Sequence, residues 1–371
     1  MTVRLTARPV RALLPKAPPR VRITTGSIGF LDATDDDRRR WMRGFRTLLD
    51  GLDAPLQVLV HVLVYGGAGP SASDGGARDR DGGSVPAPAL RRALDLEHAR
   101  RLREGPDAQR RTVTLVTTAE AAKIVERALV AFGLPEVRRR DDPTPPTVVH
   151  EGVELPGAWW DETGLYRTWY LDRYPGIELD PGWLLRLLPP GLELFLSWHA
   201  EHLHTPGVVD FLQRQLIQLR ARQIGRNEVG EPEVTGALPA VQRLQQQLIA
   251  REENAFHVAL YLAVRTHGPR ELAAATTRIE AAARSSLVVL RRATFRQREG
   301  RVATSAFGLD PLRRQRVLDS SSATTLAPWW DADLQQPDGL LVGVSRRTGQ
   351  PVVIDPFDER RFANANTEVA R

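Results

Sequence analysis

Apolar positions in the first part of the chain predict strands separated by helices. LQVLVHVLV at residues 56–64 is an apolar run with the length of a buried strand, and TVTLVTT at 112–118 predicts another. Helical spacing follows at 119–132, and acidic residues at 32–37 begin an earlier helix, where the helix dipole favours negative charge. This order predicts a small α+β domain over residues 23–137, with ferredoxin-like layers.

The second half repeats this strand and helix order. FHVALYLAVR at 256–265 alternates as a strand, and Gly268–Pro269 opens a helix whose apolar spacing continues to Leu290. Before it, the segment 207–254 predicts a long helical hairpin with glutamines on its outer faces. We therefore expect a second α+β domain over residues 158–335.

The remaining segments are predicted from their composition. Residues 66–87 hold seven glycines and few apolar residues, which predicts a flexible insertion. Residues 138–157 are charged and rich in proline, which predicts a connector between the two domains. At the C-terminal end, residues 336–371 contain two short apolar runs around Gly349, which predict a β-hairpin.

Positive charge is concentrated at the N-terminal end. The formal net charge is +6, and residues 1–22 carry six bases and no acid, so the rest of the chain is neutral. The bases of this predicted arm are Arg4, Arg8, Arg11, Lys16, Arg20 and Arg22. Such an arm suits anionic lipid headgroups, nucleic acid or an acidic partner, and a solvated tail is the alternative.

The sequence offers little catalytic chemistry. Cysteine is absent, which excludes disulfides, thiolate metal sites and a cysteine nucleophile. A weak candidate for a metal site is formed by His199, His202 and His204, whose alternative role is a polar strand end. Elbow motifs of the GxSxG type are absent as well. We therefore predict no catalytic residue and no bound cofactor in this chain.

Four of the eight tryptophans gather within residues 159–183. Trp159, Trp160, Trp169 and Trp183 could stack on bases, or they could form a core or an interface. The stacking interpretation, combined with the basic arm, gives an alternative function, which is binding of single-stranded nucleic acid.

Lysine is scarce, with two residues against 49 arginines. A Walker A loop needs a lysine after a glycine-rich turn to reach the nucleotide phosphates. Lys16 and Lys123 both lie outside any glycine-rich loop. The sequence therefore predicts no ATP hydrolysis by this chain alone.

No apolar run reaches the length of a membrane-spanning helix, and the N-terminus lacks the apolar part of a signal peptide, which predicts a cytoplasmic protein.

The C-terminal segment resembles a known family. PDGLLVG at 337–343, TGQPVVIDPF at 348–357 and NAN at 364–366 resemble the lead-in to the motor domain of conjugative type IV secretion ATPases, the TraC/TraE-like conjugal-transfer family. The residues that match the family's signature are Gly339, Gly343, Gly349, Pro351, Val352, Asp355, Phe357, Asn364 and Asn366.

This resemblance implies a specific role. In the family a glycine-rich loop with lysine follows the last asparagine closely, whereas here the sequence reads TEVAR after Asn366. The resemblance therefore implies the accessory, pre-motor half of such an ATPase, with ATP and Mg²⁺ expected only in the missing motor domain. It implies a docking and scaffold role in DNA transfer, peripheral to the inner membrane, with other type IV secretion components and further copies of the chain as partners.

Overall fold

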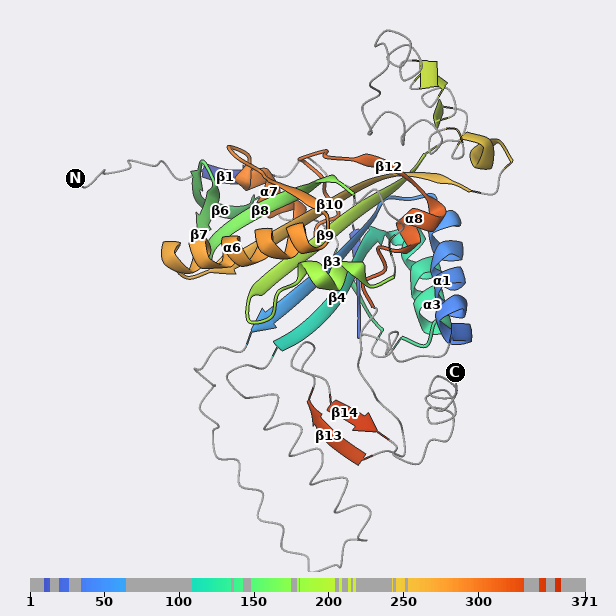
Figure 1. Ribbon diagram of the computed structural model, residues 1–371, viewed down its shortest axis with the longest axis horizontal. Helices are drawn as coiled ribbons and strands as arrows, with labels where there is room; N and C mark the ends of the chain where they lie inside the picture. The colour runs from blue at the N-terminus through green and yellow to red at the C-terminus, as the bar shows by residue number, and fades with distance from the viewer. Residues whose placement is uncertain are drawn as a thin grey trace, which may run out of the picture.

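Strands from both halves of the chain lie in one antiparallel sheet. In the computed structural model this sheet has the order β1-β6-β7-β8-β10-β9-β3-β4-β2-β5, with β11 beside β8 and β12 beside β10 (Figure 1). A separate two-stranded sheet contains β13 and β14. The chain is thus a mixed α+β protein, as the sequence predicts.

The structure describes residues 10–13, 20–26, 35–64, 109–134, 137–142, 148–174, 179, 181–203, 207–208, 213–214, 216–217, 242, 245–250, 253–329, 340–344 and 351–354. The strands are β1 (Val10–Leu13), β2 (Arg20–Thr25), β3 (Leu56–Val64), β4 (Gln109–Thr118), β5 (Arg138–Asp142), β6 (Val148–Leu155), β7 (Ala158–Asp161), β8 (Gly164–Arg173), β9 (Glu193–Leu203), β10 (Ala255–Thr266), β11 (Val289–Arg292), β12 (Arg316–Asp319), β13 (Leu340–Val344) and β14 (Pro351–Ile354). The helices are α1 (Asp35–Asp50), α3 (Ala119–Ala131), the 3₁₀ helix η1 (Trp183–Leu187), α6 (Pro269–Ser285), α7 (Gln297–Ala303) and α8 (Ser320–Thr324).

Two runs of elements have the same arrangement. The run β2-α1-β3-β4-α3-β5 lies in the sheet as β5-β2-β4-β3, and the run β8-η1-β9-β10-α6-β11 lies as β11-β8-β10-β9. The two units meet where β3 pairs antiparallel with β9, with Leu59 opposite Ser197. Because the order of the second unit mirrors that of the first across an antiparallel pair, a local pseudo-two-fold axis passes through this seam.

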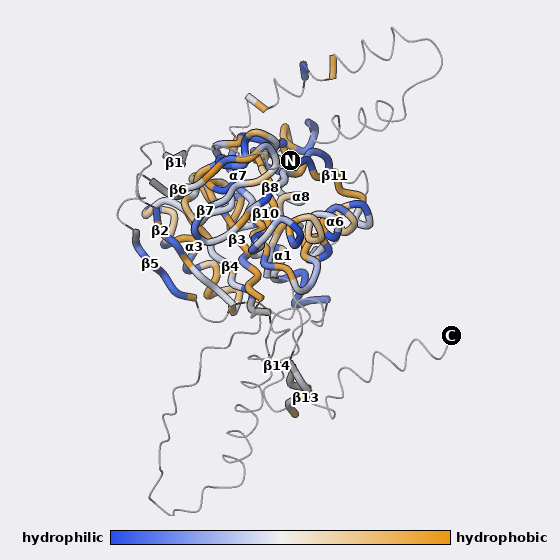
Figure 2. The backbone as a smooth tube through the Cα atoms, turned by 90° about the vertical axis from the view of Figure 1, so that its left-hand side faces the viewer, coloured by the Kyte–Doolittle hydropathy of each residue, from blue (hydrophilic) through white to orange (hydrophobic). Residues whose placement is uncertain are grey.

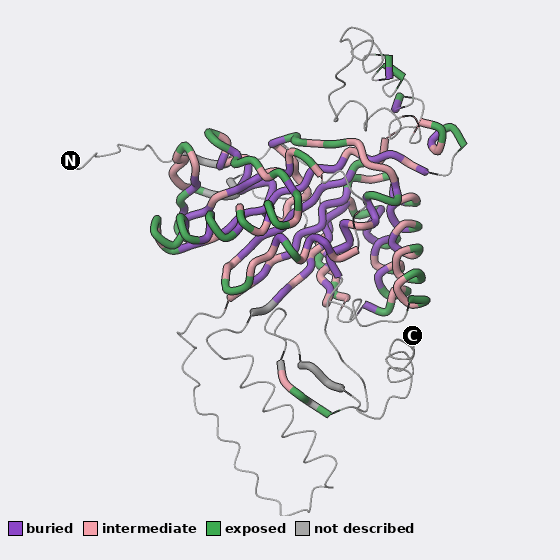
Figure 3. The backbone as a smooth tube through the Cα atoms, viewed as in Figure 1, coloured by how far each residue is buried: buried purple, intermediate pink, exposed green. Residues whose placement is uncertain are grey.

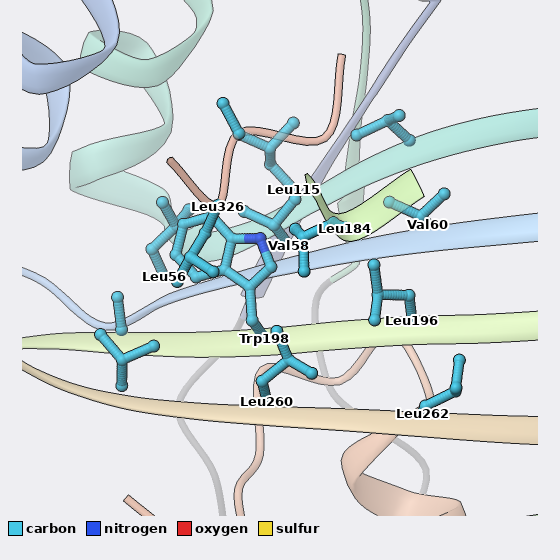
Figure 4. Close-up of a cluster of buried hydrophobic side chains, with 14 of the residues drawn as sticks. Leu56, Val58, Val60, Leu115, Leu184, Leu196, Trp198, Leu260, Leu262 and Leu326 are labelled. Atoms are coloured by element: carbon cyan, nitrogen blue, oxygen red, sulfur yellow. The ribbon is translucent and has the colours of Figure 1, made fainter. Parts of the chain in front are cut away.

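One face of the sheet carries the main core. Side chains on alternate positions of a strand share a face, and Leu194, Leu196 and Trp198 of β9 all belong to a large buried cluster under α1, α3, η1 and α6. Figure 4 shows the Trp198 ring among leucines and valines that come from both units. The apolar core is therefore continuous across the seam.

The second face is covered over part of its area by α7 and residues 304–315. Gly300 of α7 lies so close to β8 that a Cβ atom there would fall 2.6 Å from the Cβ of Thr168. With both faces covered, the middle strands are buried along most of their length (Figure 3).

Two long connections occupy the same position in the two units. Residues 65–108 join β3 to β4, and residues 204–254 join β9 to β10. Since β3 and β9 are antiparallel, the two connections leave the sheet at opposite ends. The predicted insertion 66–87 and most of the predicted helical hairpin 207–254 lie outside the described residues.

Several predicted boundaries differ from the structure. The predicted connector 138–157 contains all of β5 and β6, and the predicted arm 1–22 contains β1 and the start of β2. The strand β5, RRRDD, is hydrophilic along its length (Figure 2), so it lacks the apolar pattern that would identify a strand. The helix predicted to continue to Leu290 ends at Ser285, and Leu287 has a left-handed backbone (φ 56°).

The strand predictions at 56–64, 112–118 and 256–265 and the helix at 119–132 are confirmed, with ends shifted by at most three residues. Gly133 follows α3 with φ 74°. None of the described helices is long and apolar enough to cross a membrane.

Candidate functional site

The histidine cluster proposed from the sequence does not assemble in this fold. His199 and His202 both lie on β9, and a spacing of three residues places them on opposite faces of the sheet. His202 packs edge-on against Phe256 with ring centroids 5.3 Å apart, and His204 lies outside the described residues. No group of three metal-ligating side chains occurs in the described part of the chain.

The aromatic group is mostly core. Trp159 and Trp169 are fully buried and Trp183 is 3% exposed, so their rings have no free face for stacking on a base. Trp160, on the opposite side of β7, is 59% exposed. The strand pattern accounts for this difference, because neighbouring residues point to opposite faces.

Only part of the basic arm and of the C-terminal signature can be located. Arg20 and Arg22 lie on β2, and Arg11 lies on β1. Arg4, Arg8 and Lys16 lie outside the described residues. In the antiparallel pair of β13 and β14, Gly343 lies opposite Val352 of β14, which also contains Pro351. The signature residues Gly339, Gly349, Asp355, Phe357, Asn364 and Asn366 lie outside the described residues.

A buried polar network on the second face joins the two units at the seam. Gln57 of β3 is 1% exposed. Its Nε2 lies 2.9 Å from Ser197 Oγ and donates to the carbonyl oxygens of Ala303 (3.2 Å) and Ser305 (2.9 Å). Its Oε1 accepts a hydrogen bond of 2.7 Å from the backbone N–H of Gly308. One side chain therefore holds both the seam and the segment that covers the second face.

His199 extends this network as a neutral ring. Its Nε2 lies 2.9 Å from the Ala303 carbonyl oxygen, and because a carbonyl only accepts, Nε2 carries the hydrogen. Burial lowers the pKa of His199, and the positive charge of Arg20 adds to this effect, while Asp310 opposes it. The ring therefore stays uncharged at neutral pH.

A buried ion pair fastens α7 to the end of β7. Arg301 Nε lies 3.4 Å from Asp161 Oδ2, and its guanidinium lies 4.1 Å from the centroid of the Tyr166 ring. Asp161 also accepts hydrogen bonds from Trp159 Nε1 (3.1 Å) and from the backbone N–H of Thr163 (2.9 Å). The Asp161 carboxylate and the Arg301 guanidinium thus both have their partners within the folded chain.

Beside this network lies a pocket of about 700 Å³. It opens between one end of the central strands and the segment from α7 to residue 315. Its lining side chains include Arg20, Glu201, His257, Arg298, Asp310 and Arg313. Its volume is in the range of small-molecule sites.

The wall formed by residues 308–315 is held rigidly. Tyr261 donates a hydrogen bond to Asp310 Oδ1, and Asp310 also accepts from the backbone N–H of Arg313 (2.9 Å) and from Gln315 Nε2 (3.2 Å). Burial, followed by the nearby Asp310 carboxylate, raises the pKa of Tyr261. Tyr261 therefore remains a hydrogen-bond donor, and Asp310 is fully engaged as an acceptor.

Sequence reasoning identified Arg20 and His199 in this region but missed Gln57, Asp310 and Arg313. A signal for Gln57 was present, because Gln57 and His61 are the polar positions of the apolar run 56–64 and their spacing puts them on one strand face. Asp310 and Arg313 lie on an irregular segment with no periodic pattern.

No protein-family model matches this chain, and no curated protein matches it.

Proposed function

We propose that this chain is an accessory docking and scaffold domain of a conjugal-transfer, type IV secretion ATPase at the cytoplasmic face of the inner membrane. The proposal is supported by the resemblance of residues 337–366 to the lead-in of that family's motor domain. It is also supported by the β13–β14 hairpin, which contains Gly343, Pro351 and Val352 of that signature.

The finer fold proposal is a pair of ferredoxin-like units. In the first unit the β-α-β-β-α-β order and the sheet order β5-β2-β4-β3 support it. In the second unit η1 takes the place of the first helix. Two such units in one sheet give a broad, stiff platform with connections leaving opposite ends, which suits a scaffold.

The observation that carries the docking role is a strained apolar rim beside β11. Leu287 is 64% exposed and Phe295 is 73% exposed, and both have left-handed backbones (φ 56° and 58°). Bulky residues rarely adopt this conformation, which costs about 1–3 kcal/mol. Val289, 41% exposed, lies on the edge strand between them. Exposed apolar side chains held at a conformational cost favour a partner that covers them.

The test separates docking from stability. Asparagine tolerates the left-handed conformation better than phenylalanine, so Phe295→Asn should leave the fold equally or more stable. In cells that express the other secretion components, the wild-type chain should fractionate with the inner membrane and the Phe295→Asn variant should be lost from it. The matched control is Val130→Asn, which replaces an exposed apolar residue on α3 and should keep the wild-type distribution.

Two results would contradict the docking role. One is membrane fractionation that does not depend on the other secretion components. The other is unchanged fractionation of the Phe295→Asn variant. Phosphate release from ATP by the purified chain, above the rate without protein, would contradict the proposed lack of ATPase activity.

A further inference from the structure

We propose that the pocket beside Gln57 and His199 binds a small phosphorylated molecule through the guanidinium of Arg20. This inference goes beyond the docking role and does not depend on it. It rests on an arginine that lacks an acceptor, on the charges around the pocket, and on the rigidity of the pocket wall.

The Arg20 side chain makes no hydrogen bond or ion pair with any residue that the structure describes. Its Nε is buried without a partner, and burial lowers its pKa. A partly buried guanidinium without an acceptor is costly in free energy, and a bound anion would offset that cost. Arg20 cannot move away with its strand, because β2 is paired on both sides, with Thr118 and Asp142 opposite Arg20.

Side chains of the lining segment favour an anion over a cation. Asp310 is engaged by Tyr261, by the Arg313 backbone and by Gln315. Glu299 Oε1 lies 3.5 Å from Arg296 and 4.0 Å from Arg298. The guanidinium of Arg313 has no carboxylate partner among the described residues. Asp310 and Glu299 are thus hydrogen-bonded or ion-paired within the wall, and Glu201 is the third acid of the lining. In contrast, the guanidinium of Arg20 has a buried Nε without an acceptor.

The charge and shape of the site select phosphate over a single carboxylate. More than one arginine lines the pocket, and a doubly charged group gains from each of them. His199 stays neutral and adds no competing charge change near pH 7. The Gly308 backbone closes the wall beside Arg20, since a Cβ at Gly308 would lie 3.3 Å from Arg20 Nε. The volume of about 700 Å³ leaves room for the rest of a small molecule.

Inorganic phosphate is the probe for this site. A ligand that binds only the folded chain raises its unfolding temperature saturably. We expect phosphate to raise the unfolding midpoint of the full chain, and acetate at the same ionic strength to have little effect. A calorimetric titration should give one phosphate site per chain.

Substitutions of the pocket arginines test whether phosphate binds in this pocket. Arg20→Gln should weaken phosphate binding at least tenfold, and Arg313→Gln, on the exposed wall, should weaken it several-fold without affecting folding. Arg270→Gln is the matched control, because Arg270 is exposed on α6 at the opposite face of the sheet. Circular dichroism checks that each variant is folded, and Arg313→Gln decides the question if Arg20→Gln does not fold.

The proposal is overturned by any of three results. The first is the absence of a saturable effect of phosphate on the wild-type chain. The second is binding of phosphate by the folded arginine variants as tight as that of the wild type. The third is stabilisation of the chain by acetate as strong as that by phosphate. The last result would assign the pocket to carboxylates.

Discussion

The ion pair of Asp161 with Arg301 is a site where the change of one side-chain group should alter the free energy of unfolding. Both side chains are nearly inaccessible, at 3% and 10% exposure. Burial by itself raises the pKa of Asp161, but the hydrogen bonds from Thr163 and Trp159 and the charge of Arg301 outweigh it, so the pKa lies below its usual value. A buried ion pair adds little net stability when it is complete, whereas removal of one partner leaves the other charge buried and uncompensated.

We predict that Asp161→Asn lowers the free energy of unfolding at pH 7 by about 3 kcal/mol. The folded pKa of Asp161 is lower than the unfolded one, so the unfolded chain takes up the proton first as the pH falls. The contribution of Asp161 is therefore complete above the unfolded pKa, which is near 3.8, and it is lost below that. Urea unfolding at a series of pH values should show the wild type converging toward the variant below about pH 4.

Asp36→Asn is the control for this experiment. Asp36 is 95% exposed on α1, and the change should alter stability by no more than about 0.5 kcal/mol. Parallel pH curves for the wild type and Asp161→Asn would show that Asp161 has no depressed pKa in the folded chain.

Residue identity alone did not reveal which side chains belong together. The tryptophans had two open interpretations, and strand alternation decides between them, since Trp159 is buried while Trp160 is exposed. The same alternation separates His199 from His202. Partners such as Arg301 and Asp161 are 140 positions apart in the chain, so only the sheet order brings them together.

At the scale of elements, the short helix α7 is the main support of the second sheet face. Its Gln297 side chain accepts from the backbone N–H of Thr168 (2.8 Å) and donates to the Ala293 carbonyl oxygen (3.0 Å). At the end of α7 and directly after it, Ala303 and Gly308 form hydrogen bonds with Gln57. The position of α7 therefore sets both the buried polar network and the pocket wall.

We predict that Gly300→Ala destabilises the chain although alanine favours helices. The added Cβ would meet Thr168 side-chain atoms at 2.6 to 2.9 Å, and such overpacking costs about 1–3 kcal/mol. This cost exceeds or cancels the helix-propensity gain of about 1 kcal/mol. Thermal unfolding of the two proteins measures the difference.

Gly268→Ala is the matched change for comparison. Gly268 precedes α6 with an extended backbone (φ −161°), and a Cβ there meets nothing within 4 Å. We expect a change of less than about 1 kcal/mol at this N-cap position. A Gly300→Ala protein as stable as Gly268→Ala would mean that α7 does not pack tightly on β8.

The elements that the sequence predicted are those with strong apolar periodicity. The strands β3 and β10 and the helices α3 and α6 have continuous apolar faces because they are covered by the core. The strand β5 escaped prediction because an edge strand with exposed side chains needs no apolar pattern. The end of α6 was placed too late because Leu290 continues the helical spacing although it lies on β11.

For the whole molecule, the pairing of β3 with β9 turns two similar units into one folded body. Predicted domains ending near residue 137 and starting near 158 would each have a core of their own, but one buried cluster contains residues of both units. Phe45 of α1 packs edge-on against Trp198 of β9, with ring centroids 6.3 Å apart, and against Trp329, at 5.2 Å. Neither unit buries its apolar face without the other. The strand order that creates this arrangement depends on long-range pairing, which local patterns do not reveal.

We predict that the described body unfolds in a single cooperative transition because its core crosses the seam. Phe45→Leu in the first unit and Leu262→Ala in the second both reduce the same buried cluster, and the second should cost about 2–5 kcal/mol. Differential scanning calorimetry of the full chain should show one main transition, and each variant should shift that transition as a whole. Two separate transitions, with each variant moving only one of them, would mean that the units are thermodynamically independent and that the β3–β9 pair joins them without coupling their stability.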